Sequence, residues 1–283
     1  MKGTVSLSIV TPSLSMLPYL RCCAASIADQ QGVAIEHIVI DGGSSDGTAA
    51  WLSGQSEILG VSEKDRGMYD AVNKGLRLAQ GEILAYLNCD EQYLPGTLAF
   101  VANFFSGHPG VDLLFGDFLV TRPDGSLVAY RKSFIPRPIY IYASYLYTFT
   151  CTMFFRRRII DDGLWFDPGL RIAGDAEWLL RVLSAGFSAR HCSRYFSVFI
   201  DTGENASRGR EALAAARREY GGEMPAWLKS VRFPVSGLRL LEKTLRGNYR
   251  QSSPLAYDMY KVGAPESRRH FIAERPAFRW RNR

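Results

Sequence analysis

Four short apolar segments alternate with helical segments in the first ninety residues, and this alternation constrains the fold more than any other feature. The apolar segments are LSIVT, AIEHIVID, SEILGVSE and GEILAYLN, at residues 7–11, 34–41, 56–63 and 81–88. Candidate helices lie between them at residues 16–28, 46–54 and 67–79, the last with apolar or small side chains at helical spacing. Strands that alternate with helices form βαβ units with parallel strands. The sequence therefore predicts an α/β fold with a mainly parallel sheet flanked by helices.

Each apolar segment ends in, or is followed by, a polar cluster. The clusters are TPS (11–13), DGGSSD (41–46), EKDRG (63–67) and NCDE (88–91). The carboxyl ends of parallel strands lie at one edge of a sheet, and ligands of such sheets bind beyond that edge. We therefore expect the four clusters to line one binding site.

The cluster NCDE carries the chemistry that best suits a metal ion. Asp90 and Glu91 supply carboxylates, and Asn88 supplies an amide suited to a sugar hydroxyl. Hard cations such as Mg²⁺ or Mn²⁺ take oxygen ligands, often one or two carboxylates plus substrate phosphates. The alternative is a helix N-cap, because a helix is expected to follow Pro95.

The second half of the chain has a different pattern. Residues 111–120, the turn PDG at 123–125 and the following SLVAYRK predict a hairpin, and residues 174–187 predict a helix closed by a glycine. Helical composition also appears at 211–220. The uncharged segment 139–155 contains many tyrosines and threonines, so we interpret it as a buried strand and aromatic wall rather than a spanning helix.

Composition excludes several classes of protein. The chain of 283 residues is 47% hydrophobic and 22% charged, which is typical of a folded protein and not of a disordered one. Its five cysteines are scattered without a CxxC pair, which argues against a disulfide framework and a cysteine zinc site and fits a reducing compartment. The N-terminus lacks the pattern of a signal peptide.

The net charge of +6 is unevenly distributed, since residues 1–204 carry −4 and residues 205–283 carry +10. Such a basic tail suits nucleic acid, an anionic membrane or acidic substrates, or is simply a solvated basic surface. Within the tail, Leu238, Leu241 and Leu245 share one helical face, and Arg239, Lys243 and Arg246 lie elsewhere. This pattern fits an interfacial helix on an anionic bilayer, and equally a helix packed on the rest of the protein.

Four motifs together resemble a known family. The segments VTPSLSMLPYLRCCAASI, EHIVIDGGSSDGT, SEKDRGMYDAVNKGLRLAQGEILAYLNCDE and GDAEWLLR follow one another in the order and spacing of the family 2 glycosyltransferases with the GT-A fold. The resemblance covers residues 5–205. It implies a catalytic domain at 1–205, followed by a mostly helical basic C-terminal extension at 206–283.

The resemblance implies a nucleotide-diphosphate sugar as donor, with a UDP-sugar favoured, and Mn²⁺ or Mg²⁺ on its diphosphate. Thr11, Pro12 and Ser13 would line the nucleoside. Asp41 would bind the base or ribose, and Asp65 the base. The alternative for both aspartates is turn capping.

The metal and catalytic motifs match the family with departures. Asn88 stands for the first acid of the Asp-x-Asp motif, Cys89 is unusual at its middle position, Asp90 matches the metal-binding acid and Glu91 replaces a frequent Asp. Asp175 aligns with the catalytic base and Glu177 with a supporting acid, whereas Gly174 replaces a frequent Glu. One base and direct displacement imply inversion at the anomeric carbon. Asp117 matches a Gly-Asp pair near the acceptor.

Several residues have two interpretations. His191 could approach the metal, Trp178 could stack on a sugar, and Arg156, Arg157 and Arg158 could contact phosphates. A structural histidine, a core tryptophan and a solvated basic turn are the alternatives. Lys74 is expected to pair with an acid.

These inferences predict an inverting, metal-dependent transferase that moves one sugar at a time to a lipid-linked or polysaccharide-precursor acceptor. Single transfer is expected because no QxxRW-like motif is present. We expect a cytoplasmic protein, peripheral on the inner face of the cell membrane, with no nucleic-acid partner. The rivals are a catalytically silent nucleotide-sugar binding protein and a nucleotidyltransferase, although the latter typically has a Gly-rich phosphate loop that VTPSLSMLP lacks.

Overall fold

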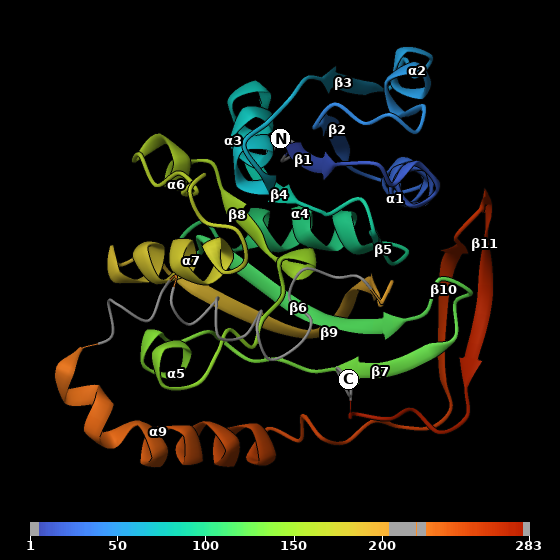
Figure 1. Cartoon of the computed structure of the whole chain (residues 1–283). Helices are drawn as coiled ribbons and strands as arrows, with labels where there is room; N and C mark the ends of the chain where they lie inside the picture. The colour runs from blue at the N-terminus through green and yellow to red at the C-terminus, as the bar shows by residue number, and fades with distance from the viewer. Residues whose placement is uncertain (1–5, 204–218, 220–224, 280–283) are drawn as a thin grey trace.

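The structure, a computed structural model, describes residues 6–203, 219 and 225–279 (Figure 1). Its strands are β1 (Ser6–Ser13), β2 (Ala34–Asp41), β3 (Ile58–Ser62), β4 (Ile83–Tyr86), β5 (Glu91–Tyr93), β6 (Leu113–Thr121), β7 (Leu127–Arg131), β8 (Phe154–Arg156), β9 (Ala189–Ile200), β10 (Leu255–Lys261) and β11 (Ala264–Ala273). Its helices are α1 (Leu17–Ala28), α2 (Thr48–Ser53), α3 (Met68–Leu78), α4 (Thr97–Gly107), α5 (Pro138–Ala143), α6 (Arg158–Asp161), α7 (Gly174–Ser184) and α9 (Ala226–Leu245), with a 3₁₀ turn η1 (Thr150–Thr152).

The described residues form a large sheet in the order β3-β2-β1-β4-β8-β6-β9-β5, with β7 paired to β6. The first four strands in this order are all parallel, as the alternation of segments predicts. The other half is mixed, because β8 runs antiparallel to both β4 and β6 while β9 runs parallel to β6. The predicted α/β fold is confirmed, and the predicted hairpin is the pair β6–β7.

Side chains on the two faces of the sheet enter two separate cores. On β1, Val10 packs with α3 and α7, whereas Leu7 and Ile9 pack with α1 and α4. The close approach of α3 depends on Gly75, because a Cβ at that position would lie 2.3 Å from Cγ1 of Val10. Tight packing of this helix fixes the loop before it, where the EKDRG cluster lies.

Instead of the predicted strand, the uncharged segment 139–155 forms two short helical turns with irregular chain between them, and only its last two residues are in a strand. Its residues make up α5, η1 and only the first part of the short strand β8. The predicted aromatic wall is present, with Tyr147 stacked on Phe134 at a centroid distance of 4.5 Å. Within the described residues, no helix has the length and apolar character needed to cross a bilayer.

The elements described from residue 225 onward are α9 and the two-stranded sheet β10–β11, which lie along two sides of the large sheet (Figure 1). The sequence predicts the helix but not the hairpin. The helix docks on α5 through polar contacts, among them Tyr140 Oη to Glu242 at 3.0 Å and Arg232 Nε to the Ala143 carbonyl at 3.0 Å.

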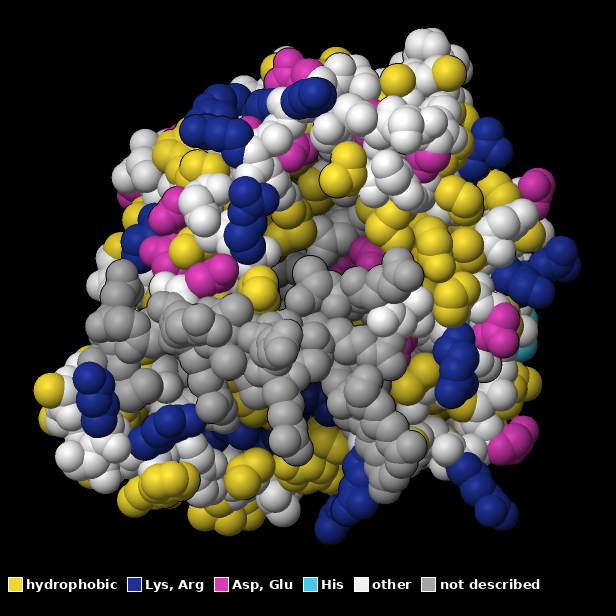
Figure 2. Space-filling model, viewed as in Figure 1, with side chains coloured by type: hydrophobic (Ala, Val, Ile, Leu, Met, Phe, Trp, Pro, Cys, Tyr) yellow, Lys and Arg dark blue, Asp and Glu magenta, His cyan; other side chains and the backbone are white. Residues whose placement is uncertain are grey.

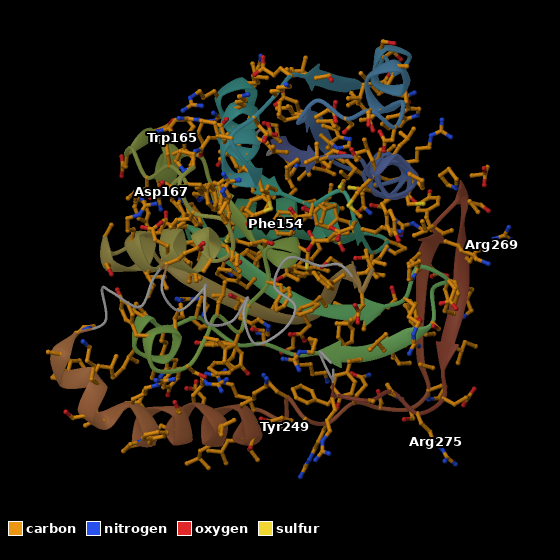
Figure 3. The ribbon with its side chains drawn as sticks, viewed as in Figure 1. Phe154, Trp165, Asp167, Tyr249, Arg269 and Arg275 are labelled. Atoms are coloured by element: carbon orange, nitrogen blue, oxygen red, sulfur yellow. The ribbon has the colours of Figure 1, made fainter. Side chains whose placement is uncertain are left out.

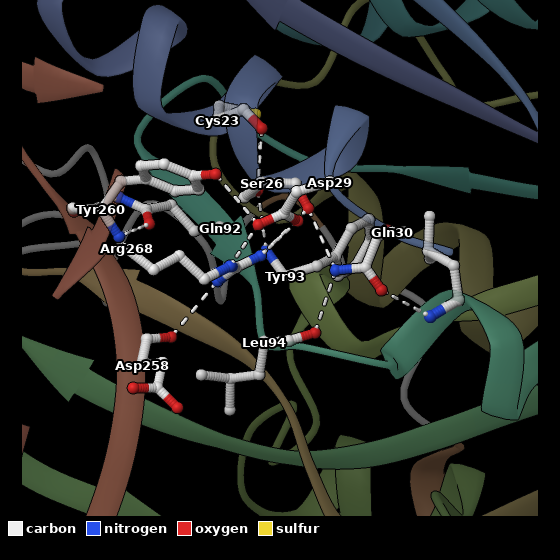
Figure 4. A network of polar contacts seen from close by, with 11 residues as sticks. Cys23, Ser26, Asp29, Gln30, Gln92, Tyr93, Leu94, Asp258, Tyr260 and Arg268 are labelled. Carbon is white, nitrogen blue, oxygen red and sulfur yellow. Dashed lines mark hydrogen bonds and ion pairs between the residues drawn. The ribbon is translucent and has the colours of Figure 1, made fainter. Parts of the chain in front are cut away.

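A partly buried polar network joins the hairpin to α1 and β5 (Figure 4). Arg268 forms an ion pair with Asp29 at 2.5 Å, and the hydroxyl of Tyr260 donates to the same carboxylate at 2.9 Å. The side-chain amide of Gln92 exchanges two hydrogen bonds with the backbone of Tyr260, at 2.8 and 2.9 Å. The boundary at 205 remains a prediction, and most of the helix expected at 211–220 lies outside the described residues.

Candidate active site

Two buried polar atoms without partners mark the carboxyl ends of neighbouring strands. Oγ of Ser13, at the end of β1, and Oδ1 of Asn88, just after β4, accept or donate no hydrogen bond in the described structure. Buried polar atoms in folded proteins are nearly always paired, so two orphans at one sheet edge point to a missing ligand. Both atoms belong to clusters that the sequence assigns to the binding site.

Cys89 is a core residue and not a metal ligand. Its side chain is buried with Leu20, Val39 and Leu52. Burial raises the pKa of the thiol to about 12, and the neighbouring charge of Asp90 adds to this effect. A neutral thiol is a poor ligand, so the unusual residue at this position leaves the oxygen chemistry of its neighbours intact.

Glu91 and Asp90 occupy different environments in the NCDE turn. Glu91 is 1% exposed, and its Oε2 accepts from the backbone N–H of Asn88 at 2.9 Å. Burial, followed by the charge of Asp90, raises the pKa of Glu91 well above its usual range. Asp90 is half-buried. A bound cation would lower the pKa of both carboxylates, because it favours their charged forms, and would so oppose the effects of burial and of mutual repulsion.

These donors fit a hard divalent cation. The described residues contain no group of three or more histidine, cysteine, aspartate or glutamate side chains arranged for a metal. Mg²⁺ and Mn²⁺ sites that also use substrate phosphates need only one or two carboxylates, which Asp90 and Glu91 provide. The orphaned Oδ1 of Asn88 lies in the same turn.

Two of the predicted nucleoside residues, Thr11 and Asp41, already have partners within the described structure, unlike Ser13. Thr11 and Asp41 are fully buried and already bonded, with Thr11 Oγ1 3.0 Å from Nε2 of His37 and Asp41 accepting from Ser44 N–H at 3.1 Å and from Ser62 Oγ at 2.6 Å. Their first role is to hold the strand ends and the loop after β2. Burial lowers the pKa of His37 to about 4, so this histidine is neutral.

Asp65 lies beside the loop after β2, as the predicted cluster requires. Its Oδ1 accepts from the N–H of Gly67 at 2.9 Å, and the carboxyl group is half-buried. A Cβ at Gly42 would lie 2.6 Å from Asp65 Oδ2, so only glycine lets the two loops meet this closely. Pro12 is buried between them at the end of β1.

Asp175 begins α7 against the ring of Tyr69. Its backbone N–H donates to the Tyr69 hydroxyl at 3.0 Å. Gly174 gives this contact room, because a Cβ there would lie 2.5 Å from Cε2 of Tyr69. The departure of Gly174 from the family pattern therefore has a local steric reason.

The environment of Asp175 suits a proton acceptor near neutral pH. Burial raises the pKa of its carboxyl to about 6, against the lowering effect of backbone N–H donors and with a further rise from the charge of Glu219. Asp175 also raises the pKa of Glu91, so the NCDE turn and the start of α7 interact electrostatically. Figure 2 shows acidic side chains at the bottom of a hollow in this face of the molecule.

The sequence analysis does not identify Glu219, which supports the turn before α7. Its carboxylate accepts from the backbone N–H groups of Arg171, Ile172 and Ala173 at 3.1, 3.0 and 2.7 Å. Three consecutive N–H donors bound by one carboxylate hold this turn and the residue that follows it. Helical composition around 211–220 is the only signal in the sequence, and it says nothing of where this side chain points.

Glu177 and Asp117 are both paired within the protein. Glu177 binds Arg181 one turn later, with Arg181 Nη2 to Oε2 at 2.9 Å. Asp117 is buried, and its Oδ1 accepts from Ser133 N–H at 2.9 Å and lies 2.8 Å from Nε2 of His191. His191 therefore pairs with Asp117, which is the structural alternative to a metal ligand.

The remaining ambiguous residues are structural. Trp178 is a fully buried core residue and donates to the Leu164 carbonyl at 2.7 Å. Lys74 pairs with Glu63 at 2.7 Å, as expected. The three arginines make contacts within the protein. Arg156 binds Glu82 and Arg157 binds the Gly81 carbonyl, just before β4 and at the opposite end of that strand from the NCDE turn. Arg158 is exposed and binds Asp112, just before β6.

Curated relatives match part of the chain. A "PGL/p-HBAD biosynthesis glycosyltransferase" of Mycobacterium tuberculosis is 37% identical over 119 residues, which cover 40% of this chain and 46% of the relative. "Glycosyltransferase AglE" of Haloferax volcanii is 28% identical over 195 residues, covering 64% of this chain and 62% of the relative. The chain thus spans about half the length of the mycobacterial relatives it matches.

Solved structures share the fold at low sequence identity. Staphylococcus aureus TarS 1–349 in complex with UDP-GlcNAc superposes with a TM-score of 0.61 at 15% identity, covering 85% of this chain and 73% of TarS 1–349. Mannosyltransferase PcManGT from Pyrobaculum calidifontis, in complex with GDP-Man and Mn²⁺, gives a TM-score of 0.55 at 16% identity, covering 84% and 75%.

The model of one protein family matches residues 8–165, more than half of the chain. These residues include β1, β2, the NCDE turn and the Asp65 loop, so the match contains the cluster around the two orphaned oxygens. The chain belongs to glycosyl transferase family 2.

Proposed function

We propose that this protein is an inverting glycosyltransferase that moves a single sugar from a nucleotide-diphosphate sugar to an acceptor hydroxyl. The observation that carries the proposal is the pair of orphaned buried oxygens, on Ser13 and Asn88, beside Asp90 and in a site electrostatically coupled to Asp175. Family membership supplies the class of reaction. Buried oxygens without partners supply the reason to expect a polar ligand.

The donor nucleotide would lie between the ends of β1 and β2 and the loop before α3. Asp65 is the half-buried carboxylate there and would accept from a base N–H, and Asp41, whose bonds hold the neighbouring loop, would bind the base or ribose. Thr11, Pro12 and Ser13, buried at the end of β1, would line the nucleoside. Uracil is the favoured base because TarS was solved with UDP-GlcNAc, although PcManGT was solved with GDP-Man.

Asp90 and Glu91 would hold Mn²⁺ or Mg²⁺ beside the diphosphate, with Asn88 available to a sugar hydroxyl. Such an ion supplies Lewis-acid stabilisation of the charge on a departing diphosphate. The protein's own part is to keep two carboxylates close together. Glu91 is held by the Asn88 N–H, and burial, followed by repulsion from Asp90, raises the pKa of Glu91.

Asp175 would take the proton from the attacking acceptor hydroxyl. A carboxylate with a pKa of about 6 is ionised at neutral pH and is more basic than an ordinary aspartate. A single base and direct attack on the anomeric carbon give inversion. Glu177, through Arg181, supports the helix that carries the base.

The acceptor would be lipid-linked or a polysaccharide precursor, with the protein cytoplasmic and resting on the inner face of the cell membrane. The support is α9, whose solvent-facing side is apolar: Phe233, Leu245 and Trp227 are 85%, 77% and 60% exposed. In Figure 2, hydrophobic side chains line the lower edge where α9 lies in Figure 1. An apolar helix face within a strongly basic segment fits an anionic bilayer.

A panel of nucleotide sugars tests the function. The purified protein is incubated with each donor and Mn²⁺, then with a chelator, and release of the nucleoside diphosphate is measured with a lipid-extract acceptor. The proposal predicts release that requires acceptor and stops with chelator. Nucleotide-sugar binding without release would indicate a silent binding protein, and pyrophosphate release from a nucleoside triphosphate would indicate a nucleotidyltransferase.

A further inference from the structure

Helix α9 differs from a simple amphipathic helix because two of its cationic side chains are buried against the protein. Its exposed side is mostly apolar, although it includes Lys229, whereas Arg239 and Lys243, one turn apart, are each only 4% exposed and face the body of the protein. Lysine and arginine are almost never this buried unless paired. Something must offset the loss of hydration of these two cations.

Arg239 has no acceptor in the described structure for two of its nitrogens. Nε and Nη1 are both buried and make no hydrogen bond. The guanidinium lies over two aromatic rings, with Cζ 4.7 Å from the centroid of Tyr145 and 5.8 Å from that of Tyr147. Cation–π contact offsets part of the charge but leaves the N–H donors unsatisfied.

Lys243 and Arg131 gather around the same aromatic ring. Lys243 Nζ lies 4.7 Å and Arg131 Cζ 4.8 Å from the centroid of Phe278, and Tyr249, labelled in Figure 3 just beyond the end of α9, also stacks near Lys243 Nζ at 5.5 Å. Burial lowers the pKa of Lys243 to about 7, and the charges of Arg131 and Arg239 lower it further. The three cations therefore form one group around these rings, which we call the cation cluster.

Too few acids in the described structure lie near the cation cluster to neutralise it. Among the described residues, no carboxylate forms an ion pair with Arg131, Arg239 or Lys243. Asp117 acts on Lys243 at longer range, but its Oδ1 is taken by Ser133 N–H and His191. Glu242, on the same helix, is paired with Arg137 and Arg246.

An anion with several strong acceptor oxygens would resolve all of these features. A guanidinium binds phosphate with parallel N–H donors, and an ammonium adds a compact charge beside it. Aromatic walls exclude water and strengthen such contacts. A carboxylate carries one negative charge, whereas a phosphoryl group carries close to two and has three strong acceptor oxygens, so it can bind all three side chains and offset most of their charge.

We propose that Arg131, Arg239 and Lys243 form a binding site for a phosphoryl anion between α9 and β7. Asp117, which the family resemblance places toward the acceptor, acts on Lys243 of this site at longer range. It deepens the proposed function by naming a phosphorylated acceptor, although binding at this site is measurable without any turnover.

Calorimetric titration with inorganic pyrophosphate tests the site directly. EDTA is present throughout, so that a metal-dependent donor site cannot take the probe. We expect saturable binding to the unaltered protein, weakened at least tenfold by Arg239→Gln and by Lys243→Met. The matched control is Lys229→Gln, which removes an exposed cation from the same helix and should leave the affinity unchanged. Absence of binding, or equal affinity in all four proteins, overturns the proposal.

Thermal unfolding separates an anion site from a purely structural cation cluster. At constant ionic strength, pyrophosphate should raise the Tm of the unaltered protein and leave the Tm of Arg239→Gln unchanged. Without the anion, Arg239→Gln should be at least as stable as the unaltered protein, because it removes a desolvated charge. A variant that is less stable and responds to pyrophosphate like the unaltered protein would assign Arg239 a structural role only.

Vesicles distinguish the two sources of such a phosphate. If the natural ligand is a lipid headgroup, vesicles with phosphatidic acid should compete with pyrophosphate, whereas vesicles with phosphatidylcholine alone should not. If phosphatidic acid vesicles still compete with pyrophosphate in the Arg239→Gln variant, the headgroup does not bind at the cation cluster. Pyrophosphate binding without vesicle competition assigns the site to a free phosphorylated acceptor.

Discussion

At the residue scale, the chemistry of Asp175 comes from opposing influences on one carboxyl group. Burial and the charge of Glu219 favour the protonated form, whereas the N–H donors at the start of α7 favour the ionised form. The balance leaves a pKa of about 6. This is high enough for a useful base and low enough for ionisation at neutral pH.

The first prediction concerns the pH dependence of activity. For the unaltered protein, kcat/KM should fall tenfold per pH unit below about pH 6, because the base becomes protonated there. Asp175→Asn should lose on the order of 10³-fold or more in kcat and retain donor binding. Glu177→Gln, two residues away and paired with Arg181, is the control and should lose far less. Full activity of Asp175→Asn would remove this residue from the mechanism.

The second prediction concerns stability. The folded pKa of Asp175 lies above its ordinary value, so the folded state holds this proton more tightly, and the carboxyl destabilises the fold increasingly from about pH 4 to pH 6. At pH 7.5, Asp175→Asn should raise the free energy of unfolding by about 2 kcal/mol. The gain should vanish near pH 4. Urea unfolding at the two pH values measures it, and a variant less stable than the unaltered protein at pH 7.5 would refute the burial argument.

Single residues of the site were predictable from the sequence to different degrees. The clusters at the strand ends were predictable, because parallel topology alone brings Ser13 and Asn88 to one edge of the sheet. The internal bonding of Asp41 was not, since Ser62 follows twenty-one residues later in the chain and only the folded sheet brings it near. The same limit hides the steric dependence of Gly174 on Tyr69.

At the element scale, the start of α7 is held by a residue from outside the family match. Glu219 binds three consecutive N–H groups before the helix, and its charge also raises the pKa of Asp175. The extension thereby contributes to the geometry and to the electrostatics of the site.

The third prediction follows from this contact. Glu219→Gln keeps an acceptor for the N–H groups but removes the charge, so the acid limb of the kcat/KM profile should move to lower pH. Glu219→Ala should add a loss of kcat, because the turn before the base loses its support. Glu242→Gln, an acid of the extension far along α9, is the control and should leave the limb in place. An acid limb that does not move in Glu219→Gln would exclude the electrostatic role.

Elements were predicted best where periodicity was long. The segments that became β1, β2 and α3 have clear alternation or helical spacing, and each was identified. Residues 139–155 were not, because uncharged aromatic residues fit a strand and a buried helical turn equally well. The β10–β11 hairpin was not predicted from the sequence. Its outer side is mostly polar, and the surface on which it packs belongs to α1 and β5, far away in the chain.

At the scale of the whole molecule, α9 gives the protein one apolar edge (Figure 2). Its inner side is fixed to α5 by polar contacts, and its outer side has no cover in the described structure. A bilayer surface would cover this outer side of α9. It would also bring a lipid-linked acceptor to the helix that carries Arg239 and Lys243 of the proposed phosphoryl site.

The fourth prediction is binding to anionic vesicles. The protein should cosediment with vesicles that contain phosphatidylglycerol, and binding should weaken as salt rises. Replacing Leu241 and Leu245 together by serine should reduce binding at least tenfold without lowering stability, since both side chains are more than half exposed. Leu59→Ser, on β3, removes an exposed leucine from another part of the molecule and is the control. Equal binding by both variants would assign α9 to another partner.

The central claim is that Asp90 anchors a cation on the donor diphosphate while Asp175 faces the same sugar. A crystal structure of Asp175→Asn with Mn²⁺ and an intact donor tests it most directly, because the variant binds the donor without consuming it. The account predicts Mn²⁺ on Asp90 and the diphosphate, with the anomeric carbon open to a hydroxyl beside residue 175. A metal bound elsewhere, or a sugar that residue 175 cannot reach through one acceptor hydroxyl, would contradict it.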